Sequence, residues 1–150
     1  MGYFKTFFLM FSIICLFIFT GYTLGGETGL LIALIMGILS NLFAYWYSDK
    51  VILSMYKAKV VNQNDSPELI KIVSELTTNA DLPTPAIYII DEDSPNAFAT
   101  GRNPSNAAIA VTRGLIEKLT QKELKGVVAH ELAHILNRDI LIATISAVFA

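Results

Sequence analysis

The run His130-Glu131-Leu132-Ala133-His134 holds the residue types in this chain that are best suited to metal chemistry. On an α-helix, residues four apart lie one turn apart on the same face, so the two imidazole rings can reach one ion. Neutral imidazole nitrogens commonly occupy corners of a tetrahedral Zn²⁺ site. The spacing therefore predicts one zinc ion per chain, with His130 and His134 as two of its ligands.

Glu131 directly follows the first of these histidines. A bound zinc ion lowers the pKa of water towards about 7, and a neighbouring carboxylate can accept the proton as the water attacks a peptide carbonyl. The alternative is that two histidines flank a glutamate by coincidence. It is disfavoured because the chain has only 2 histidines, and because a glutamate buried in an apolar helix without a cation is costly. The pattern predicts a peptidase with Glu131 as catalytic general base.

A third protein ligand, which a catalytic zinc site requires, is not evident. After His134 the sequence has no further histidine or glutamate, and Asp139 is expected on the opposite side of the helix. The metzincin pattern is excluded because it needs glycine and histidine where the chain has Asn137 and Ile140. A second hypothesis therefore stays open, namely a truncated, non-catalytic membrane protein fragment that lacks the third zinc ligand.

The helix that carries the motif is expected to begin near Gln121, because Thr120 and Glu123 form a capping-box pattern. Apolar residues then recur at helical spacing and predict one buried face. The residues expected on that face are Leu124, Val127, Val128, Leu132, Ile135 and Leu136.

An α/β unit is expected to support this helix. Ser66-Pro67-Glu68 combines an N-cap residue, a proline at the first helical position and an acid in the first turn, so a helix should start there and stop shortly after Asp81. Apolar, β-rich runs between turn residues predict short strands and one further short helix. The strands are expected at 87–90, 96–100 and 107–112, and the short helix at 114–119.

The first part of the chain is expected to lie in a membrane. Of all residues, 53% are hydrophobic, and the two longest apolar segments, 7–20 and 29–47, flank a short turn at 25–28. The second segment is long enough to cross the hydrocarbon core, which predicts an antiparallel transmembrane helical hairpin. Lysines before the first segment and after the second place both ends in the cytoplasm. The rival interpretation, a cleaved signal peptide and a secreted peptidase, is disfavoured because a second apolar segment follows so closely.

The predicted organisation is therefore an α+β membrane protein in four parts. These are a hairpin at 1–48, a linker at 49–65, a metallopeptidase unit at 66–139 and the start of a further hydrophobic helix at 140–150. Nucleic-acid binding is not expected, because the net charge is -2 and no basic cluster is present. A disulfide is excluded because Cys15 is the single cysteine.

Several motifs together resemble the HtpX family of membrane-bound zinc proteases. The segments that carry the resemblance are the N-terminal hydrophobic hairpin, Pro85-Ala86-Ile87-Tyr88-Ile89-Ile90, Ser94-Pro95-Asn96-Ala97-Phe98-Ala99-Thr100-Gly101-Arg102, Ala108-Ile109-Ala110-Val111-Thr112 with Gly114-Leu115, and the His130 to His134 motif with Asn137-Arg138-Asp139. The Asn-Ala-Phe-Ala-Thr-Gly segment is the most family-specific of them.

The resemblance implies a zincin-like, gluzincin-type fold in the bacterial cytoplasmic membrane, multi-pass, with the active site facing the cytoplasm. It implies Zn²⁺ as cofactor, a third ligand supplied by a glutamate on a later helix, and quality control of misfolded or membrane proteins as the function. It also suggests that the strands at 96–100 and 108–112 bind extended protein or peptide substrates by strand addition, with Asn96 and Phe98 as the candidate residues. The alternative for these two residues, a turn former and a core aromatic, stays open. The lipid bilayer is the other expected partner, and formation of a homo-oligomer is left open.

Overall fold

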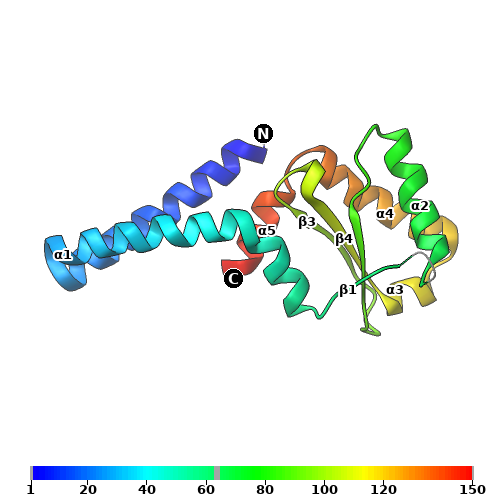
Figure 1. Cartoon of the computed structure of the whole chain (residues 1–150), viewed down its shortest axis with the longest axis horizontal. Coiled ribbons are helices and arrows are strands. Elements are labelled where there is room, and N and C mark those ends of the chain that lie inside the picture. The colour runs from blue at the N-terminus through cyan, green and yellow to red at the C-terminus, as the bar shows by residue number, and fades with distance from the viewer. Residues whose placement is uncertain (1, 63–64, 150) are drawn as a thin grey trace.

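The computed structural model describes residues 2–62 and 65–149, and shows a long apolar helix joined to a mixed α/β unit (Figure 1). The long helix is α1 (Gly2–Met55). The α/β unit contains β1 (Lys59–Val60), α2 (Pro67–Asn79), β2 (Ala86–Ile90), β3 (Ala97–Gly101), a 3-10 turn at Pro104–Asn106, β4 (Ala107–Thr112), α3 (Arg113–Lys118), α4 (Gln121–Leu136) and α5 (Ile140–Phe149). Helices α2 and α3 and strands β2 to β4 begin and end within two residues of the predicted positions, and α4 begins at the predicted residue.

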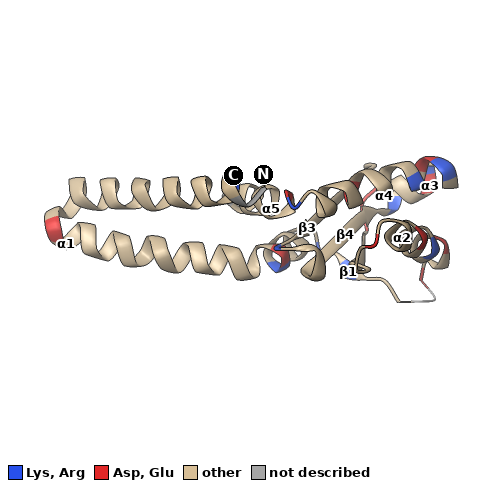
Figure 2. Ribbon diagram, turned by 90° about the horizontal axis from the view of Figure 1, so that it is seen from above, with Lys and Arg blue, Asp and Glu red and all other residues tan. Residues whose placement is uncertain are grey.

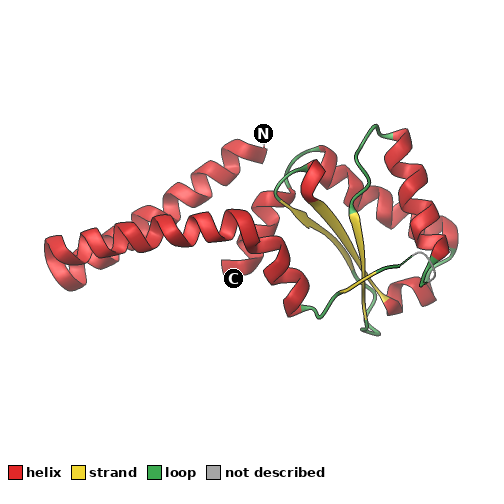
Figure 3. Cartoon of the chain, viewed as in Figure 1, coloured by secondary structure: helices red, strands yellow, loops and turns green. Residues whose placement is uncertain are grey.

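The four strands form one sheet in the order β1-β2-β4-β3. Strands β2 and β4 are parallel, whereas β1 and β3 run antiparallel to their neighbours, so β3 is an edge strand. Every residue of β4 is buried, as expected of a central strand that is covered on both faces. Helices lie on either side of this sheet (Figure 3).

Helices α2 and α4 pack on one face of the sheet and form the main core. Its fully buried or nearly buried members are Leu69, Ile72, Val73, Ile87, Ala107, Ile109, Val111, Leu115, Leu124, Val128, Leu132, Ile135 and Ile140. Residues of β4 at odd numbers face this core, while Ala108 and Ala110 face the opposite side, as the two-residue period of a strand requires. There they pack with Leu53 from the end of α1.

Helix α1 is broken at two glycines, where its direction reverses. Gly25 and Gly26 have non-helical backbone angles, and the positive φ of Gly26, 59°, is one that glycine adopts without steric cost. The two arms run back alongside each other (Figure 2). Their contact is close enough at Gly21 and Gly29 that a Cβ on either residue would overlap the other arm. Farther along, Asn41 donates a hydrogen bond from Nδ2 to the carbonyl oxygen of Met10 at 2.8 Å.

The second arm is longer than the sequence indicated. Residues 49–65 were expected as a linker, but α1 continues to Met55 and strand β1 follows at Lys59–Val60, while residues 63 and 64 lie outside the described part. The physical reason is tertiary: Ile52 and Leu53 are 6% and 7% exposed, and Leu53 packs on the sheet. This packing favours a helix over a polar connection.

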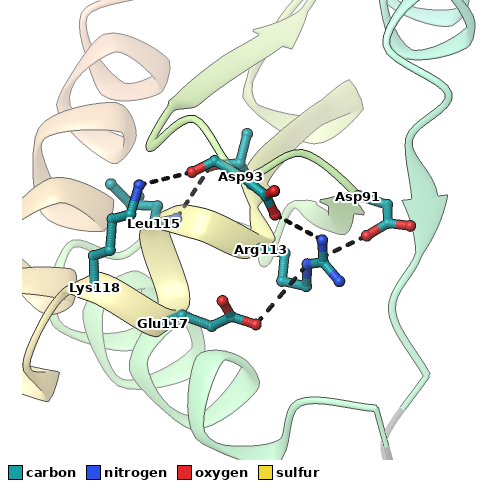
Figure 4. Close-up of polar contacts among 7 residues, drawn as sticks. Asp91, Asp93, Arg113, Leu115, Glu117 and Lys118 are labelled. Atoms are coloured by element: carbon teal, nitrogen blue, oxygen red, sulfur yellow. Dashed lines mark hydrogen bonds and ion pairs between the residues drawn. The ribbon is translucent and has the colours of Figure 1, made fainter.

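An ion-pair cluster fixes the loop that leads into β3 (Figure 4). Arg113 contacts Asp91 at 3.3 Å and Asp93 at 2.8 Å, and Lys118 donates a hydrogen bond to the Asp93 carbonyl oxygen at 2.9 Å. The charge of Asp91, with that of Asp93, raises the pKa of Arg113. Because the backbone N–H of Gly114 also bonds to the carbonyl oxygen of Glu92 at 2.9 Å, the loop is tied to the start of α3 by main chain and side chains.

Candidate active site

Helix α4 is anchored at its first turn and along its apolar face. The hydroxyl of Thr120 accepts a hydrogen bond from the backbone of Glu123, and the Glu123 carboxylate accepts one from the Thr120 backbone, so the predicted capping box is confirmed. The hydrogen bonds from Thr120 hold the pKa of Glu123 below its ordinary value. Leu124, Val128, Leu132 and Ile135 are buried against the sheet, as predicted. Leu136 is not: it ends the helix and is 54% exposed, which corrects its expected place in the buried face.

The two histidines lie on the same side of this anchored helix. Their Nε2 atoms are 3.3 Å apart and the ring planes are nearly perpendicular, at 87°. Two nitrogens bound tetrahedrally to one zinc ion at about 2.0–2.1 Å must be about 3.3–3.4 Å apart. The separation of His130 and His134 therefore fits this metal. Within residues 2–62 and 65–149, no group of three histidine, cysteine, aspartate or glutamate side chains converges to hold an ion.

The carboxylate of Glu131 is held by the edge of the sheet. Its Oε2 atom accepts a hydrogen bond from the backbone N–H of Ala99 in β3, at 3.1 Å. Backbone groups alternate in direction along an antiparallel strand, so the N–H of Gly101 points to the same side of β3 as the N–H of Ala99. The Gly101 N–H contacts the hydroxyl of Thr144 in α5 at 3.4 Å. The edge of β3 thus faces the helix of the metal motif and fixes the predicted general base.

Asp139 does not lie where the sequence placed it. It was expected on the opposite side of the helix from the histidines, but its two carboxylate oxygens lie 3.2 and 3.3 Å from Nδ1 of His134. The reason is that α4 ends at Leu136 and the chain turns at Arg138, which has a positive φ of 58°. The helix geometry used for the prediction does not apply after that turn.

Asn96 and Phe98, the two expected substrate-binding residues, line one cavity of about 520 Å³ beside the β3 edge. The ring of Phe98 packs against that of Tyr56, with centroids 5.2 Å apart. The cavity is mostly apolar, and its walls come from the end of α1, β3 and α5. They are formed by Ile52, Met55, Tyr56, Asn96, Phe98, Ala99, Thr100, Ala143, Thr144 and Ala147. Ala99, whose backbone N–H bonds to Glu131, is the residue that this lining shares with the contacts of the predicted general base.

Sequence comparisons decide the family. The model of peptidase family M48 matches residues 63–149, which is more than half of the chain. The chain belongs to peptidase family M48. It is 52% identical over 146 residues to the "Protease HtpX homolog" of Ralstonia pickettii (strain 12J), and 51% identical over 146 residues to the protein of the same name from Burkholderia ambifaria (strain MC40-6).

These matches cover 97% of this chain but 51% of each relative, so the chain spans about half the length of the curated HtpX homologs that it matches. The resemblance to HtpX proteases that the motifs indicated is confirmed. In this M48 chain, the residues that sequence reasoning missed are Ala99, Thr144 and Asp139. Ala99 and Thr144 carry no local signal, because each acts through a contact between distant segments.

Proposed function

We propose that this M48 chain is the membrane-anchored part of a zinc-dependent endopeptidase that hydrolyses peptide bonds in misfolded or membrane proteins. The observation that carries the proposal is the 3.3 Å separation of the His130 and His134 Nε2 atoms beside a fixed glutamate. The names of the HtpX relatives support a protease. The alternative of a non-catalytic fragment is not favoured, because the residues that match the family model include the whole His130 to His134 motif.

Each residue has a defined part in the proposed mechanism. His130 and His134 hold the zinc ion, which when bound polarises the substrate carbonyl and acidifies water. Glu131 accepts the proton of the attacking water and later passes it to the leaving amine. Its hydrogen bond from Ala99 supports this role, because the donor orients one carboxylate oxygen. The glutamate implied by the HtpX resemblance would complete the metal site from a later part of the protein.

The substrate is proposed to bind as an extended segment along β3. Edge strands pair readily with an added strand, and the outward N–H groups of Ala99 and Gly101 are already engaged by Glu131 and Thr144. We therefore assign substrate pairing to the Ala97 end of β3. The adjoining cavity, with Phe98 in its wall, suits an apolar substrate side chain. Exposed segments of misfolded and membrane proteins are rich in such side chains.

Membrane association is indicated by α1 together with the HtpX relatives, since the helix is apolar and long enough to cross a bilayer. Between Lys5 and Glu27, and again from Glu27 to Asp49, the arms carry no charged residue (Figure 2). Many large apolar side chains on both arms are exposed, among them Phe7, Phe11, Leu16, Phe19, Leu31, Ile35, Leu39 and Phe43. A lipid environment would cover them. We propose that both arms cross the bacterial cytoplasmic membrane, with the α/β unit in the cytoplasm.

The proposal is tested on protein expressed from its full reading frame and purified in detergent. We expect one zinc ion per chain, loss of that zinc in His134→Ala, and cleavage of casein that Glu131→Gln abolishes without loss of zinc. Glu68→Gln, which alters an exposed glutamate on α2, serves as the matched control and should retain both properties. Zinc binding that is indifferent to His134, or cleavage that persists in Glu131→Gln, would overturn the proposed function.

A further inference from the structure

Asp139 faces the ring nitrogen of His134 that points away from the other histidine. Its carboxylate oxygens are 3.2 and 3.3 Å from Nδ1, while Nε2 of the same ring is 3.3 Å from Nε2 of His130. The ring therefore stands between a carboxylate on one side and the proposed metal position on the other. Both side chains are partly exposed, His134 at 45% and Asp139 at 40%.

The backbone brings Asp139 into this position in a specific way. Helix α4 closes with hydrogen bonds from Asn137 to Ala133 and from Arg138 to Ile135, and the left-handed conformation of Arg138 then turns the chain back. The N–H of Asp139 itself contacts the carbonyl oxygen of His134 at 3.3 Å. Asp139 is thus held against the last turn of α4, directly below the second histidine.

Asp139 also occupies the N-cap position of α5, because its carbonyl oxygen accepts the bond from Ala143 at 3.3 Å. An aspartate at this position ordinarily turns its side chain to the first N–H groups of its own helix. Here both carboxylate oxygens are instead within 3.3 Å of the imidazole of His134. The side chain is directed to the histidine rather than to the helix that it precedes.

A carboxylate can only accept a hydrogen bond, so Nδ1 of His134 must carry the proton. In the neutral ring Nε2 then has the free electron pair that a metal ion needs, and it points to His130. Carboxylates that bond to metal-ligating histidines fix the tautomer and orientation of the ring and raise its basicity. We propose that Asp139 is the positioning residue of His134, which it holds as the Nδ1-protonated tautomer ready to bind zinc. The metal in this inference rests on the proposed function. The tautomer of His134 does not, because it can be measured in the metal-free protein.

The first measurement uses the metal-free chain with ¹⁵N-labelled histidine in detergent, at a pH where the ¹⁵N shifts themselves show neutral rings. Only 2 histidines are present, and a His130→Ala sample assigns their signals. We expect the His134 ring to be protonated at Nδ1 in the wild type and to shift towards Nε2 protonation in Asp139→Ala and Asp139→Ser. The serine variant is decisive because it keeps a residue type that is favoured at the N-cap position of α5 and removes the carboxylate. Asp93→Asn, an exposed aspartate paired with Arg113, is the control.

The second measurement is zinc affinity, by competition with a chromophoric chelator, for the same variants. Removal of such a partner typically weakens metal binding 10- to 100-fold, and because this pair is partly exposed we expect about tenfold in both Asp139 variants, or about 1.4 kcal/mol. Wild-type affinity or an unchanged His134 tautomer in Asp139→Ser would show that the carboxylate does not set the state of the His134 ring, and would overturn the proposal. So would a changed tautomer without any loss of zinc affinity.

The two measurements also separate this proposal from the proposed function. If the wild-type tautomer depends on Asp139 but zinc binding does not depend on His134, the metal assignment itself fails and the positioning role falls with it. If zinc binding depends on His134 and is indifferent to Asp139, the proposed function stands and the positioning role alone is refuted.

Discussion

Alanine in place of Gly114 is expected to destabilise this protein, whereas the same replacement at Gly126 is expected to stabilise it. At Gly114, near the start of α3, an added Cβ would overlap the carbonyl group of Asp93 and lie 2.9 Å from the Asp93 Cα. These are backbone atoms, so the loop before β3 would have to move. At Gly126, within α4, an added Cβ meets no atom within 4 Å.

The magnitudes follow from these two environments. Forced overpacking costs about 1–3 kcal/mol, and the better helix propensity of alanine returns at most about 1 kcal/mol, so Gly114→Ala should lose roughly 1–2 kcal/mol of the free energy of unfolding. Its loop also carries Asp93, whose contacts with Arg113 and Lys118 would be disturbed. Gly126→Ala relieves the entropic cost of a glycine inside a helix and should gain about 0.5–1 kcal/mol.

The assay is urea unfolding in detergent, followed by far-ultraviolet circular dichroism, with the two variants measured beside the wild type. The expected order of midpoints is Gly126→Ala, wild type, Gly114→Ala. A midpoint for Gly114→Ala at or above the wild type would refute the argument from backbone overlap. A marked loss in Gly126→Ala would show that the space one turn before His130 is filled in the folded protein.

Three further outcomes can be measured with the same equipment. Leu132→Ala removes a side chain that is 4% exposed in the main core, and should cost about 2–5 kcal/mol of the free energy of unfolding in urea titration. Thr120→Ala removes the cap of α4 and should cost about 1 kcal/mol, whereas Thr120→Ser should stay close to the wild type in the same titration. The pKa of Glu123 is lowered in the folded state from its ordinary value of 4.5. The contribution of Glu123 to the free energy of unfolding is therefore fully present above that value and is lost as the pH falls through the lowered pKa. The stability advantage of wild type over Glu123→Gln should therefore shrink when urea titrations are taken from neutral to strongly acidic pH, and a constant difference would contradict the assignment.

The sequence alone determined the local elements and the spacing of the residues from His130 to His134. The four-residue spacing of His130 and His134, and the capping box at Thr120 and Glu123, are properties of one helix and need no other part of the chain. Strand β4 was predicted at its observed bounds, because an apolar run between turn residues reports burial directly. Residues 7–20 and 29–47 were likewise found apolar by composition, and both are helical in the structure.

Only the tertiary structure decided what surrounds that motif. The bond from Ala99 to Glu131 joins residues 32 apart, and the contact between Thr100 and Thr144 joins residues 44 apart, so neither leaves a periodic trace in the sequence. The position of Asp139 depends on a left-handed turn at Arg138, a residue type that rarely signals such a turn. The extension of α1 to Met55 depends on Leu53 meeting the sheet. Local periodicity specifies a helix or strand, whereas the partners of its side chains are set by packing between segments distant in the chain.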